Sequence, residues 1–477
     1  MNQTLTYPTD YDDGTIGNKF VEYIDEDIEK KCINKAKSDK NKLSLKKASF
    51  EIFNGIIQID FVAIPIIFFL NGFIPSLLVI LFIYFLQMNS LRNILNCKKI
   101  TSRYTLTVYG RLCFNLRGKY FVQILLLIKP VIICCISLLV CNKIFINLFY
   151  LFLEFITSKQ FVKRENISLL LISVISFSLY WKDKIVKKEI FKILYNITFG
   201  ITIINSIFYL LYCILMKKIN MTEFNNINLG EFNFNNIIKS IGICLFIFCY
   251  QSKIFKIYLS LRKRNNIEMK NSVHFGILSS ILLISLIGFS NSFNIKNNNF
   301  EDLIDKLFYD YNNYTSIFLK ILVIIQLVLF MILSIFYLIT SSIYLKKKIN
   351  SLIKDYANKY IIELEQTDSD KKIKEEEIDK RILIIDIIIF FLYIIITFYF
   401  KNISNIIYFI GILCSNCLAI LLPSLFFLFL KKEKFFGSKY LLEKLNLVIG
   451  FFLIISSVIL FFLNFRNKEK IKVNPNK

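Results

Sequence analysis

Residues 53–65 read Phe-Asn-Gly-Ile-Ile-Gln-Ile-Asp-Phe-Val-Ala-Ile-Pro and lie inside the first long apolar segment of the chain. A plain membrane-spanning helix would carry Leu, Ile or Phe where this stretch carries Gly55, Gln58, Asp60 and Pro65. A carboxylate at the centre of a membrane helix costs roughly 2.5–3.5 kcal/mol on insertion scales, so such a residue is usually functional or paired. The stretch therefore indicates a membrane segment that is interrupted near its middle.

The rest of the chain has the pattern of an all-α polytopic membrane protein. Of its 477 residues 55% are hydrophobic, and long apolar runs recur throughout, which is the signal of transmembrane helices rather than of a soluble core. We expect a polar tail over 1–48, a transmembrane domain over 49–465 and a second polar tail over 466–477. Eleven segments are predicted, at 49–70, 73–91, 120–141, 166–181, 193–216, 237–259, 272–293, 316–345, 382–400, 404–430 and 445–465.

The chain has a net charge of +24, and the positions of its basic residues indicate the topology. Basic residues gather in short loops beside apolar segments, as in the acid-free loop 92–119 and in the loop that begins at Lys431. These loops fall on one side of the membrane, and the acidic loop around Glu301 falls on the other. The distribution favours a cytoplasmic N-terminus and contact with lipid rather than nucleic acid. It leaves the plasma membrane and the vacuolar or lysosomal membrane equally open.

No catalytic constellation is present. Cys414 and Cys417 have CxxC spacing, but they lie in an apolar segment without a nearby His, so we interpret them as buried apolar cysteines. His274 is expected at the start of the seventh segment, in a loop role. The chain has no phosphate-binding glycine loop and no zinc-protease helix motif. We expect neither an enzyme nor a metal or cofactor site.

Several motifs carry a family resemblance. Residues 246–261 read FIFCYQSKIFKIYLSL and resemble the F-x-C-H-Q-x-x-F-P-I-Y-x-E-L signature of the amino acid/auxin permease family, with one extra residue near Lys253. Tyr250 stands where the family has His, and Lys256 stands where it has Pro. Residues 403–424, which contain Ile-Gly and then Leu-Pro-Ser, resemble the tenth helix of the family. The motifs keep the order of the family, and the resemblance covers residues 49–465.

The resemblance is to sodium-coupled neutral amino acid transporters, within the larger superfamily of amino acid, polyamine and organocation carriers. It implies a LeuT-like fold, with two inverted five-helix repeats, an eleventh helix, and breaks in helices one and six. In this fold the free backbone N–H and C=O groups at the breaks meet the substrate near the midplane. The expected substrate-binding residues are Asn54, Gly55, Gln58, Ile59, Asp60, Phe246, Cys249, Tyr250 and Gln251.

Two departures bear on ion coupling. The family breaks its first helix at Gly-Ser-Gly, whereas this chain has Gln58-Ile59-Asp60. In sodium-coupled members the eighth helix supplies a Thr hydroxyl, whereas residues 327–332 offer none and Gln326 is the nearest polar group. Sodium prefers several oxygen ligands, so sodium coupling is not expected.

Asp60 is then expected to couple protons, or to meet the ammonium or cationic side chain of a substrate. The structural alternative is a carboxylate that pairs with another helix and has no role in transport. The candidate partner is Lys129 in the third segment, because a buried lysine without a counter-ion tends to lose its proton. In the fold that the resemblance implies, the third helix passes beside the first, so the pair is geometrically plausible. Such a pair could stand in electrostatically for the absent sodium ion.

The sequence therefore predicts a secondary amino acid transporter that works by alternating access. Neutral substrates are expected from the resemblance, and cationic substrates stay open because Asp60 adds negative charge. Transport would be proton-coupled or facilitative. The alternative is an amino acid-sensing membrane receptor that binds its ligand without moving it.

Overall fold

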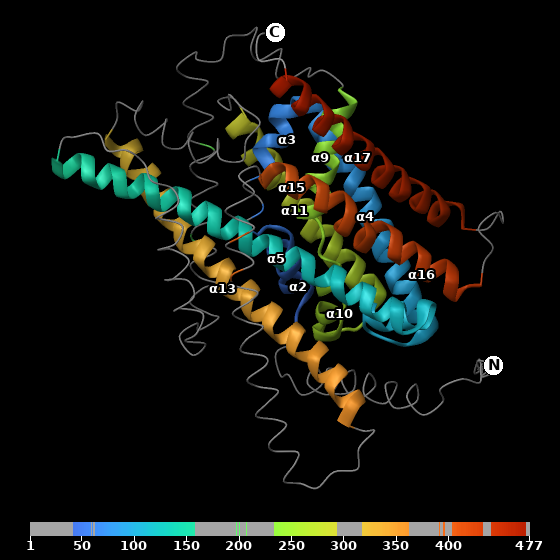
Figure 1. Ribbon diagram of the computed structural model, residues 1–477. Helices are drawn as coiled ribbons and strands as arrows, with labels where there is room; N and C mark the ends of the chain where they lie inside the picture. The colour runs from blue at the N-terminus through green and yellow to red at the C-terminus, as the bar shows by residue number, and fades with distance from the viewer. Residues whose placement is uncertain are drawn as a thin grey trace.

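A computed structural model gives the fold of the chain (Figure 1). It describes residues 42–58, 60, 63–157, 233–292, 317–361, 403–432 and 440–473, together with the isolated positions 197, 200, 207, 391 and 395. Within these residues every element is helical apart from one isolated β-bridge. Seven of the described helices are long and apolar enough to cross a membrane. The predicted class, an all-α polytopic membrane protein, is confirmed.

The predicted segments at 166–181, 193–216 and 382–400, apart from the isolated positions, lie outside the described residues. The described elements are α2 (Leu45–Ile56), α3 (Ile64–Asn71), α4 (Phe73–Thr101), α5 (Leu106–Thr157), α9 (Phe234–Ile247), α10 (Gln251–Ser260), α11 (Asn266–Ser292), α13 (Ile317–Ile361), α15 (Ile403–Ile410), the π-helical turns η2 (Gly411–Ser415) and η3 (Cys417–Leu421), α16 (Leu422–Leu430) and α17 (Leu441–Val473).

Both predicted breaks are present. The first segment stops as an α-helix at Ile56 and resumes at Ile64, and Pro65 lies in the first turn of the new helix. Proline suits this position because its missing N–H is one that a helix start leaves unpaired. The sixth segment stops at Ile247 and resumes at Gln251. Each break leaves backbone N–H and C=O groups without helical partners.

The helices extend further than the apolar runs indicate. Ser44 caps α2, so the first helix begins inside the stretch expected as a polar tail. Helix α4 continues to Thr101 rather than to residue 91, and α17 continues to Val473 rather than to residue 465. Hydropathy marks only the part of a helix that matches the bilayer core, whereas backbone hydrogen bonding continues into the polar region.

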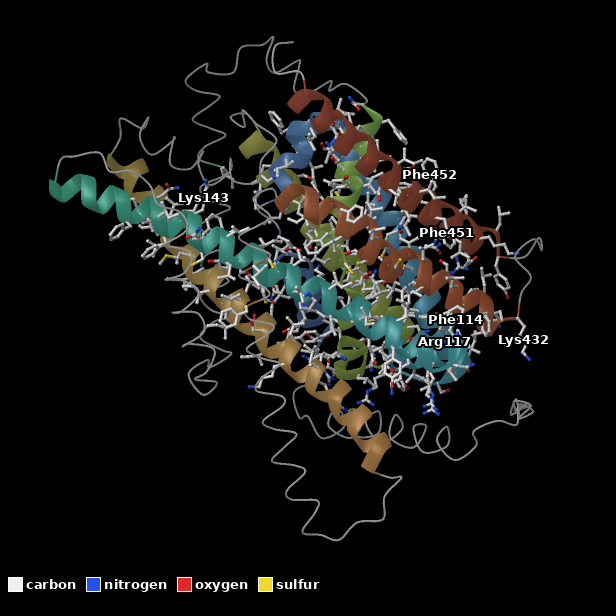
Figure 2. All side chains as sticks on the ribbon, in the orientation of Figure 1. Phe114, Arg117, Lys143, Lys432, Phe451 and Phe452 are labelled. Atoms are coloured by element: carbon white, nitrogen blue, oxygen red, sulfur yellow. The ribbon has the colours of Figure 1, made fainter. Side chains whose placement is uncertain are left out.

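The predicted loop 92–119 is mostly helical. Helix α5 begins at Leu106 and turns sharply at Phe114 and Asn115, whose dihedral angles are not helical. The Phe114 ring lies 5.6 Å from that of Phe429 in α16. Figure 2 shows Arg117 and Lys432 at the same end of the bundle. Arg117 and Lys432, which come from two of the basic loops predicted to share one side of the membrane, therefore lie at one end of the bundle.

Small residues allow close approach between helices, as is common in membranes. Gly242 of α9 and Gly411 of η2 face each other, and a Cβ at either position would overlap backbone of the partner helix. Gly276 of α11 lies similarly close to Ser49 and Ile52 of α2. On the outside of the bundle, Phe451 and Phe452 of α17 are exposed and point away from it (Figure 2), as expected of a lipid-facing helix.

Polar links join the half-helices into two pairs. Leu43 N donates to Ser260 O (2.8 Å) and Arg262 N donates to Leu43 O (3.0 Å), which ties the start of α2 to the end of α10. On the other side of the breaks, Asn71 of α3 donates to the Ser240 hydroxyl of α9. Figure 1 shows α2 and α10 toward one end of the bundle and α3 and α9 toward the other.

The cysteines in the described part of the chain are free. Seven are buried, while Cys414 and Cys417 are half-buried at the π-helical turns.

Candidate functional site

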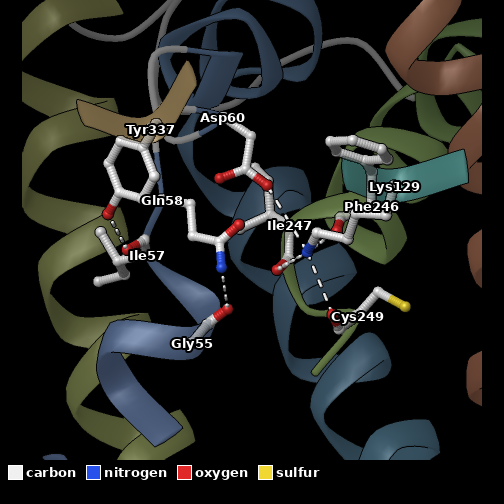
Figure 3. Close-up of polar contacts among 9 residues, drawn as sticks. All are labelled: Gly55, Ile57, Gln58, Asp60, Lys129, Phe246, Ile247, Cys249 and Tyr337. Atoms are coloured by element: carbon white, nitrogen blue, oxygen red, sulfur yellow. Dashed lines mark hydrogen bonds and ion pairs between the residues drawn. The ribbon is translucent and has the colours of Figure 1, made fainter. Parts of the chain in front are cut away.

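The two breaks meet around the side chain of Lys129, which reaches between them from α5 (Figure 3). Its Nζ donates to three backbone carbonyl oxygens of the sixth segment, at 2.8 Å (Phe246), 3.3 Å (Ile247) and 3.1 Å (Cys249). Carbonyls at the C-terminal end of a helix have no partner within the helix and carry the negative end of its dipole. The C-terminal end of α9 and the break after it therefore form a binding site for a cation, which the ammonium group of Lys129 occupies.

Asp60 lies on the other side of the same ammonium group. Its Oδ2 is 3.7 Å from Lys129 Nζ, and the carboxylate side chain is fully buried while that of Lys129 is 12% exposed. The structure thus brings together the two charged residues that the sequence analysis proposed as partners. Asp60 comes from the first break, the carbonyls come from the sixth, and the ammonium comes from a third element.

A second lysine approaches the first break. A Cβ at Gly55 would lie 3.1 Å from Lys253 Cδ and 3.4 Å from Lys253 Nζ, so the lysine chain covers this glycine. In the family motif Lys253 is only an extra residue, and it was not predicted as part of the site. The signal that could have identified it is a cation inside an apolar stretch that continues the break.

The other predicted residues of the first break differ in what the structure shows of them. Gln58 Nε2 donates to Gly55 O (3.2 Å), so the amide closes the end of α2. Asn54 is half-buried, and its Oδ1 has no hydrogen-bond partner within the described residues. Ile59 lies outside the described residues.

In the sixth segment, Phe246 and Cys249 contribute carbonyl oxygens to the site, and Phe246 also places its ring near Lys129 Nζ. Tyr250 is buried, and its hydroxyl lacks a hydrogen-bond partner in the part of the chain that the structure describes. Gln251 donates to the side-chain oxygen of Gln87 in α4. The start of α10 is therefore fixed to α4 through a buried pair of amides.

Tyr337 is a further residue of the site that was not predicted from the sequence. This residue of α13 donates its hydroxyl to Ile57 O (3.4 Å), at the point where the first segment leaves its helical path (Figure 3). In the eighth predicted segment, only residues 327–332 correspond to the family's hydroxyl-bearing stretch. The hydroxyl that reaches the first break belongs to Tyr337, one to two helical turns later. A tyrosine in an apolar run could have been flagged, because a buried phenol usually finds a hydrogen-bond partner.

The expectation for His274 was wrong. Helix α11 begins at Asn266, so His274 lies well inside a helix. Its Nδ1 shares a hydrogen bond with the Tyr84 hydroxyl of α4. The residue joins two helices rather than serving in a loop.

A match to a family model agrees with the resemblance found in the sequence. The family model described as transmembrane amino acid transporter protein matches residues 41–463. The chain belongs to this family. Membership makes it an integral membrane transport protein.

No curated protein matches the chain. Among solved structures, a mutant of the Eremococcus coleocola manganese transporter is 13% identical, with 89% of this chain and 94% of that chain covered and a TM-score of 0.46. The same transporter with an aromatic bis-isothiourea compound is 12% identical, with coverages of 96% and 97% and a TM-score of 0.46. A Na+-coupled sialic acid symporter in a substrate-bound outward-open state is 12% identical, with coverages of 94% and 97% and a TM-score of 0.38.

Proposed function

We propose that the protein is a secondary carrier of neutral amino acids, with cationic amino acids as a second substrate class, and that it works by alternating access. The observation that carries the proposal is the meeting of the two helix breaks at one buried ion pair, Asp60 and Lys129. Ionisable residues inside a membrane protein mark substrate or ion pathways. Discontinuous helices place such sites near the middle of the bilayer.

The chemistry of the breaks fits an amino acid. The N-terminal ends of α3 and α10 present free N–H groups and the positive end of a helix dipole, which suit a carboxylate. Asp60 supplies negative charge for an ammonium group or for a proton. Substrate recognition would thus be shared between backbone groups of both breaks and one carboxylate.

The links between half-helices support the alternating motion. Helices α2 and α10 are tied by the backbone hydrogen bonds of Leu43, while α3 and α9 are tied by Asn71 and by Asn236, which donates to Leu70 O (3.0 Å). Each pair would move as a body, with the two breaks as hinges. Hinges are commonly a few residues at the ends of elements.

Coupling to protons, or no coupling at all, fits the site better than coupling to sodium. Lys129 already holds the carbonyl oxygens that a sodium ion would need. The eighth predicted segment reaches the first break through the phenol of Tyr337. We place the protein in the plasma membrane or a vacuolar or lysosomal membrane, with a cytoplasmic N-terminus.

The test is uptake of a panel of radiolabelled neutral and cationic amino acids into proteoliposomes. A pH gradient, a sodium gradient and no gradient are compared. We expect saturable uptake that is indifferent to sodium. Asp60→Asn and Lys129→Met should both impair it, whereas Lys256→Met, which changes an exposed lysine of α10, should not.

Two outcomes would count against the proposal. Saturable binding without uptake would identify a receptor instead. Unchanged uptake and unchanged pH dependence in both site variants would remove Asp60 and Lys129 from the mechanism.

A further inference from the structure

We infer that the oxygens around Lys129 Nζ form a site for a monovalent cation, that the protein occupies this site with its own lysine, and that a small free cation takes the site when the lysine is removed. The free cation would be Na+, ammonium or a short alkylammonium. The inference deepens the proposed function and rests on it, because it says what holds the charge of the transport site.

The site has the ligands of a cation site. Four oxygens from the two breaks surround one nitrogen, at 2.8, 3.1, 3.3 and 3.7 Å. Three are carbonyl oxygens at the end of a broken helix, and the fourth belongs to the carboxylate of Asp60. Unwound carbonyls and the C-terminal ends of half-helices coordinate cations in transporters of discontinuous helices. One negative charge matches one monovalent cation.

A further contact favours a cation at the same point. The ring of Phe246 lies 5.3 Å from Lys129 Nζ, within the range in which an aromatic face attracts positive charge. Lys253 brings a second positive charge to the first break, over Gly55. A divalent ion in place of the Lys129 ammonium would meet the positive charge of Lys253 and only one carboxylate, so the site suits a single charge.

The lysine is held by a different element from its ligands. Lys129 belongs to α5, whereas its oxygen partners belong to the broken segments. A tethered cation cannot leave with the substrate. The carrier would therefore keep the electrostatic function of a bound cation without drawing energy from a cation gradient.

Lys129→Ala vacates the site and leaves the four oxygens without a cation. The purified variant should unfold at a lower temperature than the wild type when choline is the only added cation. Na+, ammonium or ethylammonium should raise its unfolding temperature, with a shift that grows with the logarithm of cation concentration above the dissociation constant. The wild type and Lys129→Arg, which keeps a tethered charge, should show no such response.

Two control variants separate site binding from a general salt effect, and a third variant repeats the test. Lys256→Ala removes an exposed lysine and should behave as the wild type. Lys129→Ala combined with Asp60→Asn loses the charged oxygen ligand, and at least tenfold more cation should be needed for the same shift. Lys129→Gln keeps a donor for the carbonyls and provides a second variant should the alanine variant fold poorly.

The same proteins are then tested for uptake. Cation-dependent uptake by Lys129→Ala, beside cation-independent uptake by the wild type, supports both proposals. A cation-specific thermal shift in a protein that transports no amino acid supports the cation site and contradicts the proposed function. A folded Lys129→Ala and Lys129→Gln without any cation-specific shift overturns the cation site. Failure of both to fold even with cations supplied also overturns it, because the site would then require the lysine itself.

Discussion

The contact between Gly242 and Gly411 sets how closely α9 packs against η2, and it gives a measurable test of the fold. A Cβ at Gly411 would overlap the carbonyl oxygen of Gly242 and lie 2.7 Å from its carbonyl carbon. Ordinary contact begins at 3.4 Å, so the backbones would have to separate by about 0.7 Å at that carbon (3.4 less 2.7) and by more at the oxygen. Backbone atoms cannot rotate aside as a flexible side chain can.

Gly411→Ala should therefore destabilise the protein. Overpacking a tight contact costs roughly 1–3 kcal/mol, and a loss of about 2 kcal/mol changes the ratio of folded to unfolded protein by about thirtyfold. The added Cβ would also lie 3.2 Å from Phe246 Cβ, so the strain reaches a residue whose carbonyl oxygen binds Lys129. Weaker substrate binding should accompany the lower stability.

Thermal unfolding in one detergent measures the effect, with Gly200→Ala as the matched control. A Cβ at Gly200 meets nothing within 4 Å, so this variant reports only the gain of replacing helical glycine by alanine, about 1 kcal/mol at most. The double variant Gly242→Ala/Gly411→Ala should lose less than the sum of the single variants, because one separation of the helices relieves both overlaps. An unfolding temperature for Gly411→Ala equal to or above that of Gly200→Ala would refute the reasoning.

Three further predictions concern the polar links between helices. Leu43→Pro removes the backbone N–H that donates to α10 and should slow amino acid uptake severalfold. Leu43→Ala keeps this N–H and should not slow uptake. Equal uptake rates for the two variants in reconstituted vesicles would contradict the prediction. A double-mutant cycle of Asn71→Leu and Ser240→Ala should show a coupling of roughly 0.5–1.5 kcal/mol in unfolding free energy, and additive losses would argue against the bond. Tyr258→Phe removes the phenol oxygen that accepts a hydrogen bond from Lys98 Nζ (2.7 Å). The free energy of unfolding should fall by about 1 kcal/mol, and an unchanged unfolding midpoint would contradict this expectation.

The sequence predicted the first break and the central charges because these features interrupt an apolar pattern, whereas the break in the sixth segment followed only from the family resemblance. Gln58, Asp60 and Pro65 cannot continue a plain spanning helix without cost. Asp60 and Lys129 carry opposite charges in separate apolar segments, and each needs compensation from another element. Their proximity could be argued because, in the fold that the resemblance implies, the third helix passes beside the first.

The backbone ligands of the site carry no comparable signal in the sequence. Every residue has a carbonyl oxygen, so nothing in the letters distinguishes Phe246, Ile247 and Cys249 as the ones that hold Lys129. Tyr337 reaches the first break only because α13 passes beside it, which is a consequence of tertiary packing. The ends of the helices were missed for another reason, since hydropathy measures contact with lipid and not hydrogen bonding of the backbone.

The backbone bridge at Leu43 has a consequence for how tightly the protein seals the membrane. A carrier leaks when part of its barrier opens before the rest has closed. Because the bridge ties α2 to α10, both half-helices leave the barrier in a single event. A state in which only one half-helix is displaced, and through which small solutes could leak, is then rarely populated. Vesicles that contain Leu43→Pro should therefore lose an entrapped small solute faster than vesicles that contain Leu43→Ala.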